Sequence, residues 1–114
     1  MELVDGYIDY MGGVRRRAER TLVIYRDAVM RFVDWLDGED VIAHLNVVQI
    51  RNWRHHLLTQ EKLSARTVNQ HLSALSGFCR YLYHRELIAE NPFDLLDRNG
   101  KSAIDSVKRH EGVR

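Results

Sequence analysis

SARTVNQHLSALSGFCRYLYH, residues 64–84, is the stretch that decides the fold. Its apolar residues recur at i, i+3 and i+4, which is typical of an amphipathic helix with one face on a core. Ser64 stands before the first apolar residue and is a favoured N-cap. The segment therefore predicts a helix from Ser64 to about His84. Its inward residues are Val68, Leu72, Leu75, Phe78, Cys79 and Leu82.

The other side of this predicted helix is polar, and residues 64–85 contain no Asp, Glu or Lys. A solvated helix usually mixes Glu and Lys. Asn and Gln can pair with adenine, and Arg can pair with guanine or phosphate. The composition therefore favours a contact surface for nucleic acid over a face that meets only solvent. The outward residues are Arg66, Asn69, Gln70, Ser73 and Arg80, and Gly77 is expected to leave room among them.

A weak internal repeat links this helix to an earlier segment. Residues 19–36 align without gaps on residues 65–82, with five identities in eighteen positions. Each copy has an Arg-Thr pair in its first turn, Arg20-Thr21 and Arg66-Thr67. Helix N-termini present free N–H groups and a positive dipole end, which suit a phosphate. Two explanations stay open: the two helices have equivalent roles, or they share an amphipathic pattern by chance.

The remaining segments also have helical spacing. We expect helices over Leu3–Met11, ended by Gly12-Gly13, and over residues 19–36, stopped by Asp37-Gly38. A third helix is expected after the N-cap Asn46, and a short last one opens at Asn91-Pro92. Together they predict an all-α fold, an orthogonal bundle of four main helices plus a short C-terminal helix. Residues 1–97 form the expected domain, and residues 98–114 a linker or tail.

Composition and charge suit one globular domain of 114 residues with 45% hydrophobic and 29% charged residues. The net charge of +1 does not indicate nucleic acid, but six arginines fall within residues 15–31, against two acids. This clustering leaves two explanations open, a basic face or ordinary solvated helices. The single cysteine, the lack of a signal peptide and the lack of an apolar run of about 20 residues predict a cytoplasmic protein.

Three segments in order resemble the hallmarks of a known family. TLVIYRD (21–27) with FVDWL (32–36) resembles the first, and LSARTVN (63–69) with LSAL (72–75) and FCRYL (78–82) resembles the second. The third is LIAENP at residues 87–92. The chain resembles, over roughly residues 3–97, the N-terminal core-binding (SAM-like) domain of tyrosine recombinases, the phage integrases of lambda-integrase and Xer type.

The resemblance implies a domain that grips one side of duplex DNA during integration or recombination, with two helices across the major groove. A separate C-terminal catalytic domain, expected beyond residue 114, would grip the other side. Residues Leu3–Met11 would touch neighbouring protomers on the DNA. Carried over position by position, the implied DNA contacts are Thr21, Ile24 and Asp27 on one helix and Arg66, Thr67, Asn69 and Gln70 on the other.

Several positions depart from the family pattern. Ala18 replaces a serine cap before the second helix, and Ser76 and Gly77 occupy positions where the family often has Arg or Lys. Asp27 would be repelled by phosphate unless it accepts a hydrogen bond from a cytosine amino group. The groove-facing surface is therefore expected to be less basic than the resemblance implies.

No constellation for catalysis, a metal or a cofactor is predicted. The resemblance places the catalytic tyrosine and arginines in the C-terminal domain, and the five tyrosines here lie in predicted bundle helices. His55 and His56 are adjacent, so their side chains diverge on a helix and do not make a metal site. The expected partner is double-stranded DNA. The alternative is a helical protein–protein interaction module without DNA binding.

Overall fold

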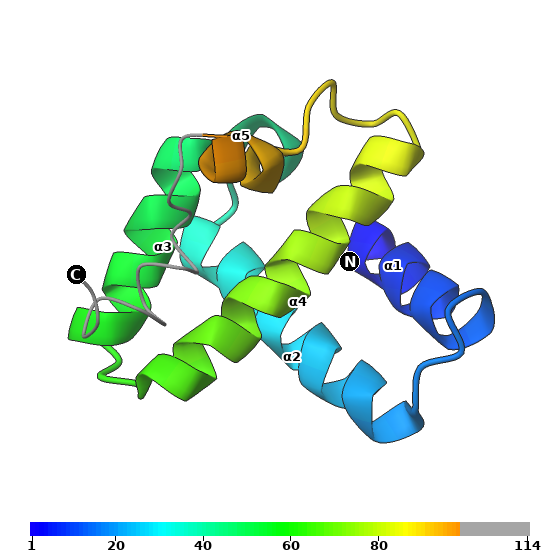
Figure 1. Ribbon diagram of the computed structural model, residues 1–114, viewed down its shortest axis with the longest axis horizontal. Helices are drawn as coiled ribbons and strands as arrows, with labels where there is room; N and C mark the ends of the chain where they lie inside the picture. Colours follow the sequence, from blue (N-terminus) through cyan, green and yellow to red (C-terminus); the bar gives the residue numbers. More distant parts are fainter. Residues whose placement is uncertain (99–114) are drawn as a thin grey trace.

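The computed structural model describes residues 1–98, and every regular element in that part of the chain is helical (Figure 1). The predicted all-α class is therefore confirmed. The α-helices are α1 (Glu2–Gly13), α2 (Glu19–Leu36), α3 (Val47–Thr59), α4 (Ala65–His84) and α5 (Pro92–Arg98), and a 3₁₀ turn, η1, covers Ile42–His44.

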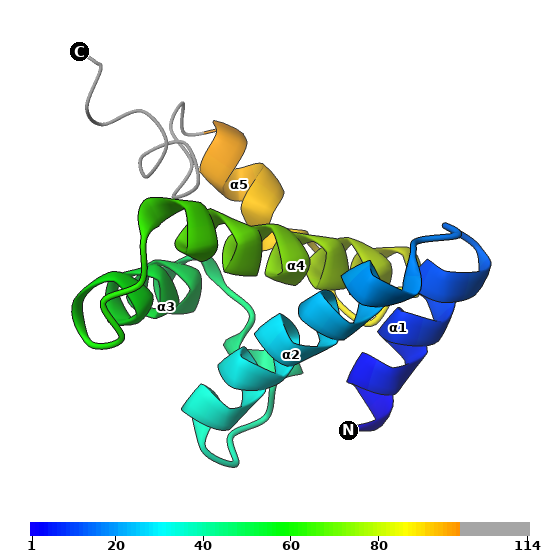
Figure 2. The ribbon, with the colours of Figure 1, turned by 90° about the horizontal axis from the view of Figure 1, so that it is seen from below.

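The two longest helices, α2 and α4, cross at the centre of the molecule and share the most extensive contact (Figure 1). α1 packs beside the crossing against both of them, and α3 packs against α4 on the other side. α5 lies against α3 and α4, and Figure 2 shows it on the side of α4 away from α2. This is the expected bundle of four main helices and one short helix.

The two copies of the repeat contribute equivalent residues to the core. Three apolar residues of α2 are identical to the aligned residues of α4, and all six side chains are buried. Two aromatic clusters flank the crossing: Phe32 packs on Trp53 of α3, and Phe78 packs on Tyr7 of α1. The two helices therefore bury matched residues, as either explanation of the repeat predicts. The buried pairs are Ala28 and Ala74, Phe32 and Phe78, and Leu36 and Leu82.

Most helix ends follow the predicted signals, but Gly12-Gly13 do not end the first helix: α1 runs on through both glycines, which cost a helix only about 1 kcal/mol each. The side chains of Asn46 and Ser64 accept hydrogen bonds from the backbone N–H groups of Gln49 and Thr67. Asn91 caps α5 by accepting from the N–H of Phe93 at 3.0 Å. α2 ends at Asp37, which itself adopts the left-handed conformation with φ 55°. Local sequence thus accounts for the starts of α3, α4 and α5 and for the end of α2.

One element was not predicted from the sequence, and one predicted segment lies outside the described residues. η1 was not predicted, because three residues carry too little periodicity to signal a turn, yet it is flanked by the buried Val41 and Leu45. Residues 99–114 of the expected tail lie outside the described residues, so the division near residue 97 stays a prediction. None of the helices in residues 1–98 has both the length and the apolarity of a membrane span.

Cys79 provides a probe of the core. Its side chain is fully buried, and burial raises the pKa of the thiol above its ordinary value. Because the thiolate is the reactive form, we expect no labelling of the native chain by an aromatic disulfide reagent at neutral pH. Labelling should accelerate only as urea unfolds the protein, in step with circular dichroism. Complete labelling of the native chain within minutes would contradict this packing.

Candidate nucleic-acid interface

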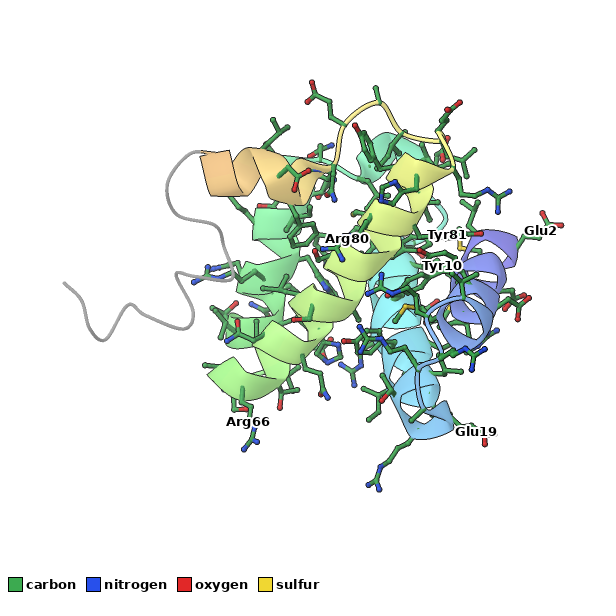
Figure 3. All side chains as sticks on the ribbon, turned by 45° about the vertical axis from the view of Figure 1, so that its right-hand side comes forward. Glu2, Tyr10, Glu19, Arg66, Arg80 and Tyr81 are labelled. Atoms are coloured by element: carbon green, nitrogen blue, oxygen red, sulfur yellow. The ribbon has the colours of Figure 1, made fainter. Side chains whose placement is uncertain are left out.

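One exposed line of side chains runs along α4. Arg66, Gln70, Ser73 and Arg80 are all exposed, at spacings that keep them on one face of the helix. We call these four residues the α4 stripe. Figure 3 shows Arg66 near the start of α4 and Arg80 near its far end. The stripe contains no carboxylate, so it presents only positive charge and neutral hydrogen-bonding groups.

Two further predicted residues of α4 lie beside the stripe rather than on it. Thr67 and Asn69 are half-buried. The hydroxyl of Thr67 accepts a hydrogen bond from the Ser64 hydroxyl at 3.1 Å, which leaves its own proton free to donate. The Oδ1 atom of Asn69 is buried without a hydrogen-bond partner among the described residues. The periodicity had predicted Asn69 to point outward with the stripe, whereas Thr67 was expected as a contact from the Arg-Thr pair and the resemblance.

The predicted residues of α2 lie on its N-terminal half. Arg20 and Asp27 are exposed, whereas Thr21 and Ile24 are half-buried. Ala18, in the N-cap position, provides no side-chain hydrogen bond, so the first-turn N–H groups lack a side-chain cap. Both α2 and α4 begin along the lower edge of the molecule in Figure 1. Within residues 1–98, no hydrogen bond or ion pair joins these α2 residues to the α4 stripe.

Two of the arginines in residues 15–31 are engaged in structural ion pairs. Arg26 binds Asp5 of α1 at 2.6 Å, and Arg31 binds Glu61 after α3. Burial alone would raise the pKa of Glu61, but hydrogen bonds from His56 and Arg31 hold that pKa below its usual range. The arginines without an ion pair inside the described part of the chain include Arg15, Arg16, Arg17, Arg20, Arg66 and Arg80.

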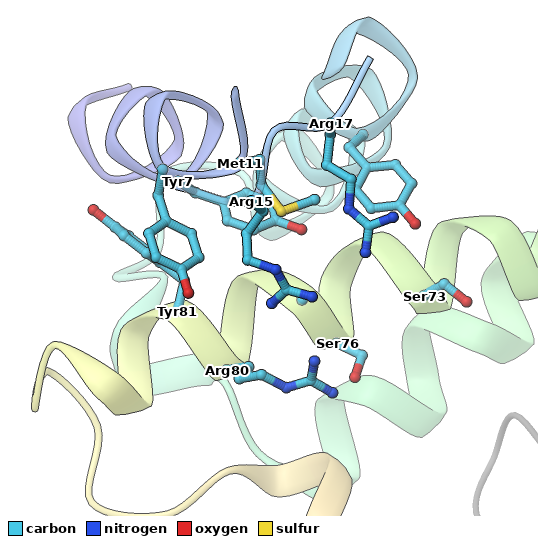
Figure 4. Close-up of a pocket in the computed structure, with 11 residues that line it drawn as sticks. Tyr7, Met11, Arg15, Arg17, Ser73, Ser76, Arg80 and Tyr81 are labelled. Atoms are coloured by element: carbon cyan, nitrogen blue, oxygen red, sulfur yellow. The ribbon is translucent and has the colours of Figure 1, made fainter. Parts of the chain in front are cut away.

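The structure brings part of the stripe together with a loop that had not been predicted to contribute. A pocket of about 220 Å³ opens between the α1–α2 loop and α4 (Figure 4). Arg15 and Arg17 of the loop point across it toward Arg80. They supply positive charge next to Ser76 and Gly77, where α4 has none. The lining residues are Tyr7, Tyr10, Met11, Arg15, Arg17, Tyr25, Ser73, Ser76, Gly77, Arg80 and Tyr81.

Backbone hydrogen bonds fix the loop that carries these arginines. The N–H of Arg15 donates to the carbonyl of Tyr10 at 3.2 Å, and the N–H of Arg17 donates to that of Met11 at 2.9 Å. Between them, Arg16 adopts a left-handed conformation with φ 54° and does not line the pocket. The reversal at Arg16 therefore lets both of its neighbours face α4, a geometry that charge counting cannot reveal.

Gly77 does not leave open space, contrary to the prediction. A Cβ atom at Gly77 would approach the Tyr7 hydroxyl far inside the 3.0 Å limit of real contacts. The same hydroxyl donates to the carbonyl of Ala74 at 3.2 Å. Burial raises the pKa of Tyr7, although Arg17 and Arg80 nearby act in the opposite direction. The missing side chain at Gly77 thus allows Tyr7 of α1 to pack closely against α4.

Because of this contact, the effect of Gly77→Ala on the free energy of unfolding should have opposite signs with tyrosine and with phenylalanine at position 7. Gly77→Ala should destabilise the protein, because overpacking costs about 1–3 kcal/mol and outweighs the gain in helix propensity of about 1 kcal/mol. In a Tyr7→Phe background the clash is gone, so Gly77→Ala should stabilise. Urea unfolding of the four proteins measures both effects. Gly13→Ala is the control, since a Cβ there meets nothing within 4 Å. Equal effects of Gly77→Ala in both backgrounds would contradict the contact.

Of the residues considered for other chemistry, some pack in the bundle and others are exposed. His55 is exposed, whereas His56 is half-buried and stacks on Trp53 with ring centroids 5.6 Å apart. The two side chains diverge, as predicted. Among the described residues no group of three His, Cys, Asp or Glu is placed to hold a metal ion. Tyr81 is buried, and Tyr25 is half-buried at the pocket.

Comparison with known proteins identifies the class to which this fold belongs. The family model described as the phage integrase, N-terminal SAM-like domain matches residues 4–86. The chain therefore belongs to this family, the N-terminal domain of tyrosine recombinases. The predicted resemblance is confirmed.

Particular relatives agree with the family. Tyrosine recombinase XerC of Treponema denticola is 30% identical over 90% of this chain and 33% of its own length. Tyrosine recombinase XerD of Pseudomonas aeruginosa is 31% identical over 79% of this chain and 30% of its own length. The chain thus spans about a third of the length of the curated relatives it matches. No solved structure matches it at the same level of significance.

Proposed function

We propose that residues 1–98 bind duplex DNA as the core-binding domain of a tyrosine recombinase. The α4 stripe and the N-terminal half of α2 lie on the DNA, and arginines contact mainly backbone phosphates. Phosphate contacts position a protein on the duplex, whereas base contacts specify sequence. On the stripe, Gln70 is suited to reading adenine and Arg66 to guanine or phosphate. A catalytic domain in the rest of the recombinase completes the grip, and α1 contacts a neighbouring protomer.

One observation carries this proposal. Arg66 and Arg80 on the α4 stripe, and Arg15 and Arg17 beside it, have no ion pair within residues 1–98, and the stripe itself has no carboxylate. A stripe that only met solvent would ordinarily mix both signs of charge. Arg66, Arg80 and the arginines of the α1–α2 loop therefore suit a polyanion better than water.

Titration of the chain with a fluorescent duplex at two salt concentrations tests the proposal. The domain alone contacts only one side of the duplex. We therefore expect a Kd in the micromolar range or weaker, roughly 10⁻⁶–10⁻⁴ M at physiological salt. Affinity should fall as salt rises, because binding releases counterions. Absence of binding at low salt, or binding that salt does not weaken, would overturn the proposal in favour of a protein–protein module.

The double variant Arg66→Ala/Gln70→Ala tests whether the α4 stripe is the DNA-binding site. Both side chains are exposed, so we expect weaker duplex binding and an unchanged midpoint of thermal unfolding. Arg51→Ala is a matched control, since Arg51 is an exposed arginine on α3, a helix that carries no residue of the stripe. Unfolding at a lower temperature would show instead that Arg66 and Gln70 are structural. Equal weakening by Arg51→Ala would show that only total charge matters.

A further inference from the structure

The pocket beside α4 concentrates positive charge in a small space. Arg15 and Arg17 reach it from the α1–α2 loop and Arg80 from α4, and their guanidinium groups turn toward the same volume (Figure 4). No carboxylate lines this pocket. None of the three arginines has an ion-pair partner within residues 1–98.

The three exposed arginines repel one another across the pocket, and an anion between them would relieve that repulsion. Arginine stays protonated at every working pH, so the repulsion cannot be relieved by losing a proton. Like charges that share a small volume repel one another, and they do so more strongly near a protein surface than in water. An anion among the three groups would replace that repulsion by charge-assisted hydrogen bonds.

The volume and the lining residues of the pocket indicate which class of anion fits it. About 220 Å³ is several times the volume of one water, roughly 30 Å³, but smaller than the pockets of about 300–1,000 Å³ that hold drug-sized ligands. Hydroxyl groups of Ser73, Ser76 and Tyr25 also line it. Guanidinium forks match the spacing of phosphoryl oxygens, and the hydroxyls add donors for the remaining oxygens.

We infer that this pocket binds one phosphoryl group, held by Arg15, Arg17 and Arg80. The loop is already fixed by its hydrogen bonds to Tyr10 and Met11, so little ordering is needed on binding. Two sources share this chemistry, a phosphodiester of duplex DNA and a free phosphate. If the source is DNA, the inference rests on the proposed function.

The first arm of the test uses inorganic phosphate with the full chain. Arginine side-chain Nε–H resonances are followed by NMR as sodium phosphate is added, and sodium chloride at matched ionic strength is the reference. We expect saturable shifts for Arg15, Arg17 and Arg80 with phosphate only. Saturation should disappear in Arg17→Gln and in Arg80→Gln, and persist in Arg51→Gln. Shifts that do not saturate, or that saturate equally in both pocket variants, would overturn the inference.

The second arm uses duplex DNA and identifies the source. A phosphodiester in the pocket predicts that Arg80→Gln lowers the slope of log affinity against log salt by about 1, the share of one phosphate contact. An unchanged slope, together with saturable phosphate binding, would assign the pocket to a free phosphate. If the wild-type chain does not bind DNA at all, the proposed function fails, and the phosphate arm still decides the pocket. Arg15→Gln replaces Arg80→Gln if the latter does not fold.

Discussion

Replacing Phe78 by alanine should cost about 3–5 kcal/mol of unfolding free energy, a large part of the 5–15 kcal/mol that holds a typical domain together. Phe78 is fully buried where α4 meets α1, and its ring packs on that of Tyr7. Removing the ring leaves a cavity that helices crossing at fixed angles cannot close. Urea unfolding followed by circular dichroism measures the loss.

Phe32→Ala should cost a similar amount, because Phe32 occupies the equivalent position of α2 and is equally buried. The matched control is Val23→Ala, since Val23 is exposed on the same helix. That change should stay within about 0.5 kcal/mol. A loss below about 1 kcal/mol for either phenylalanine would contradict the equivalence of α2 and α4 in the core.

Charge reversal at both Arg-Thr pairs should give the largest effect on binding. Arg20 and Arg66 are exposed in the first turns of α2 and α4, and neither has an ion pair within residues 1–98. Hydrogen bonds to charged groups are worth about 1.5–3 kcal/mol each. Arg20→Glu/Arg66→Glu should therefore weaken duplex binding by at least about 100-fold.

The same double variant should also lower the salt slope by about 2, since two phosphate contacts are lost. Fluorescence anisotropy with a labelled duplex at several salt concentrations measures both quantities. Arg26→Glu is a poor control, because Arg26 pairs with Asp5, whereas Arg51→Glu reverses one exposed charge on α3. An affinity loss no greater than that of Arg51→Glu would refute a phosphate role for the two pairs.

The helices could be predicted from sequence because each signal is local. The apolar spacing of residues 64–84 gave α4 its length and its buried face. Asn46, Ser64 and Asn91 cap their helices through their own side chains, within three residues. The repeat, read from five identities, correctly paired Phe32 with Phe78 as core residues. Periodicity and capping depend on neighbours in the chain, so no tertiary information was needed.

The pocket could not be predicted, because it depends on long-range placement. Arg15 and Arg17 were counted in the basic segment, but only the left-handed turn at Arg16 aims both at α4. The role of Gly77 depends on Tyr7, 70 residues earlier in the chain, whose hydroxyl fills the space a side chain would need. The sequence likewise does not show which arginines form ion pairs within the protein. Only the structure shows that Arg26 binds Asp5 and is therefore not free to bind a ligand.

Chemical-shift mapping of the labelled chain with duplex DNA at low salt identifies the DNA-binding surface residue by residue. We expect the perturbed amides and arginine side chains to lie on the α4 stripe, on the first half of α2 and on residues 15–17. The exposed surface of α3 around Val48 and Arg51 should remain unchanged at saturation. Perturbations centred on α3 or α5, or no perturbation at any DNA concentration, would contradict DNA binding through α2 and α4.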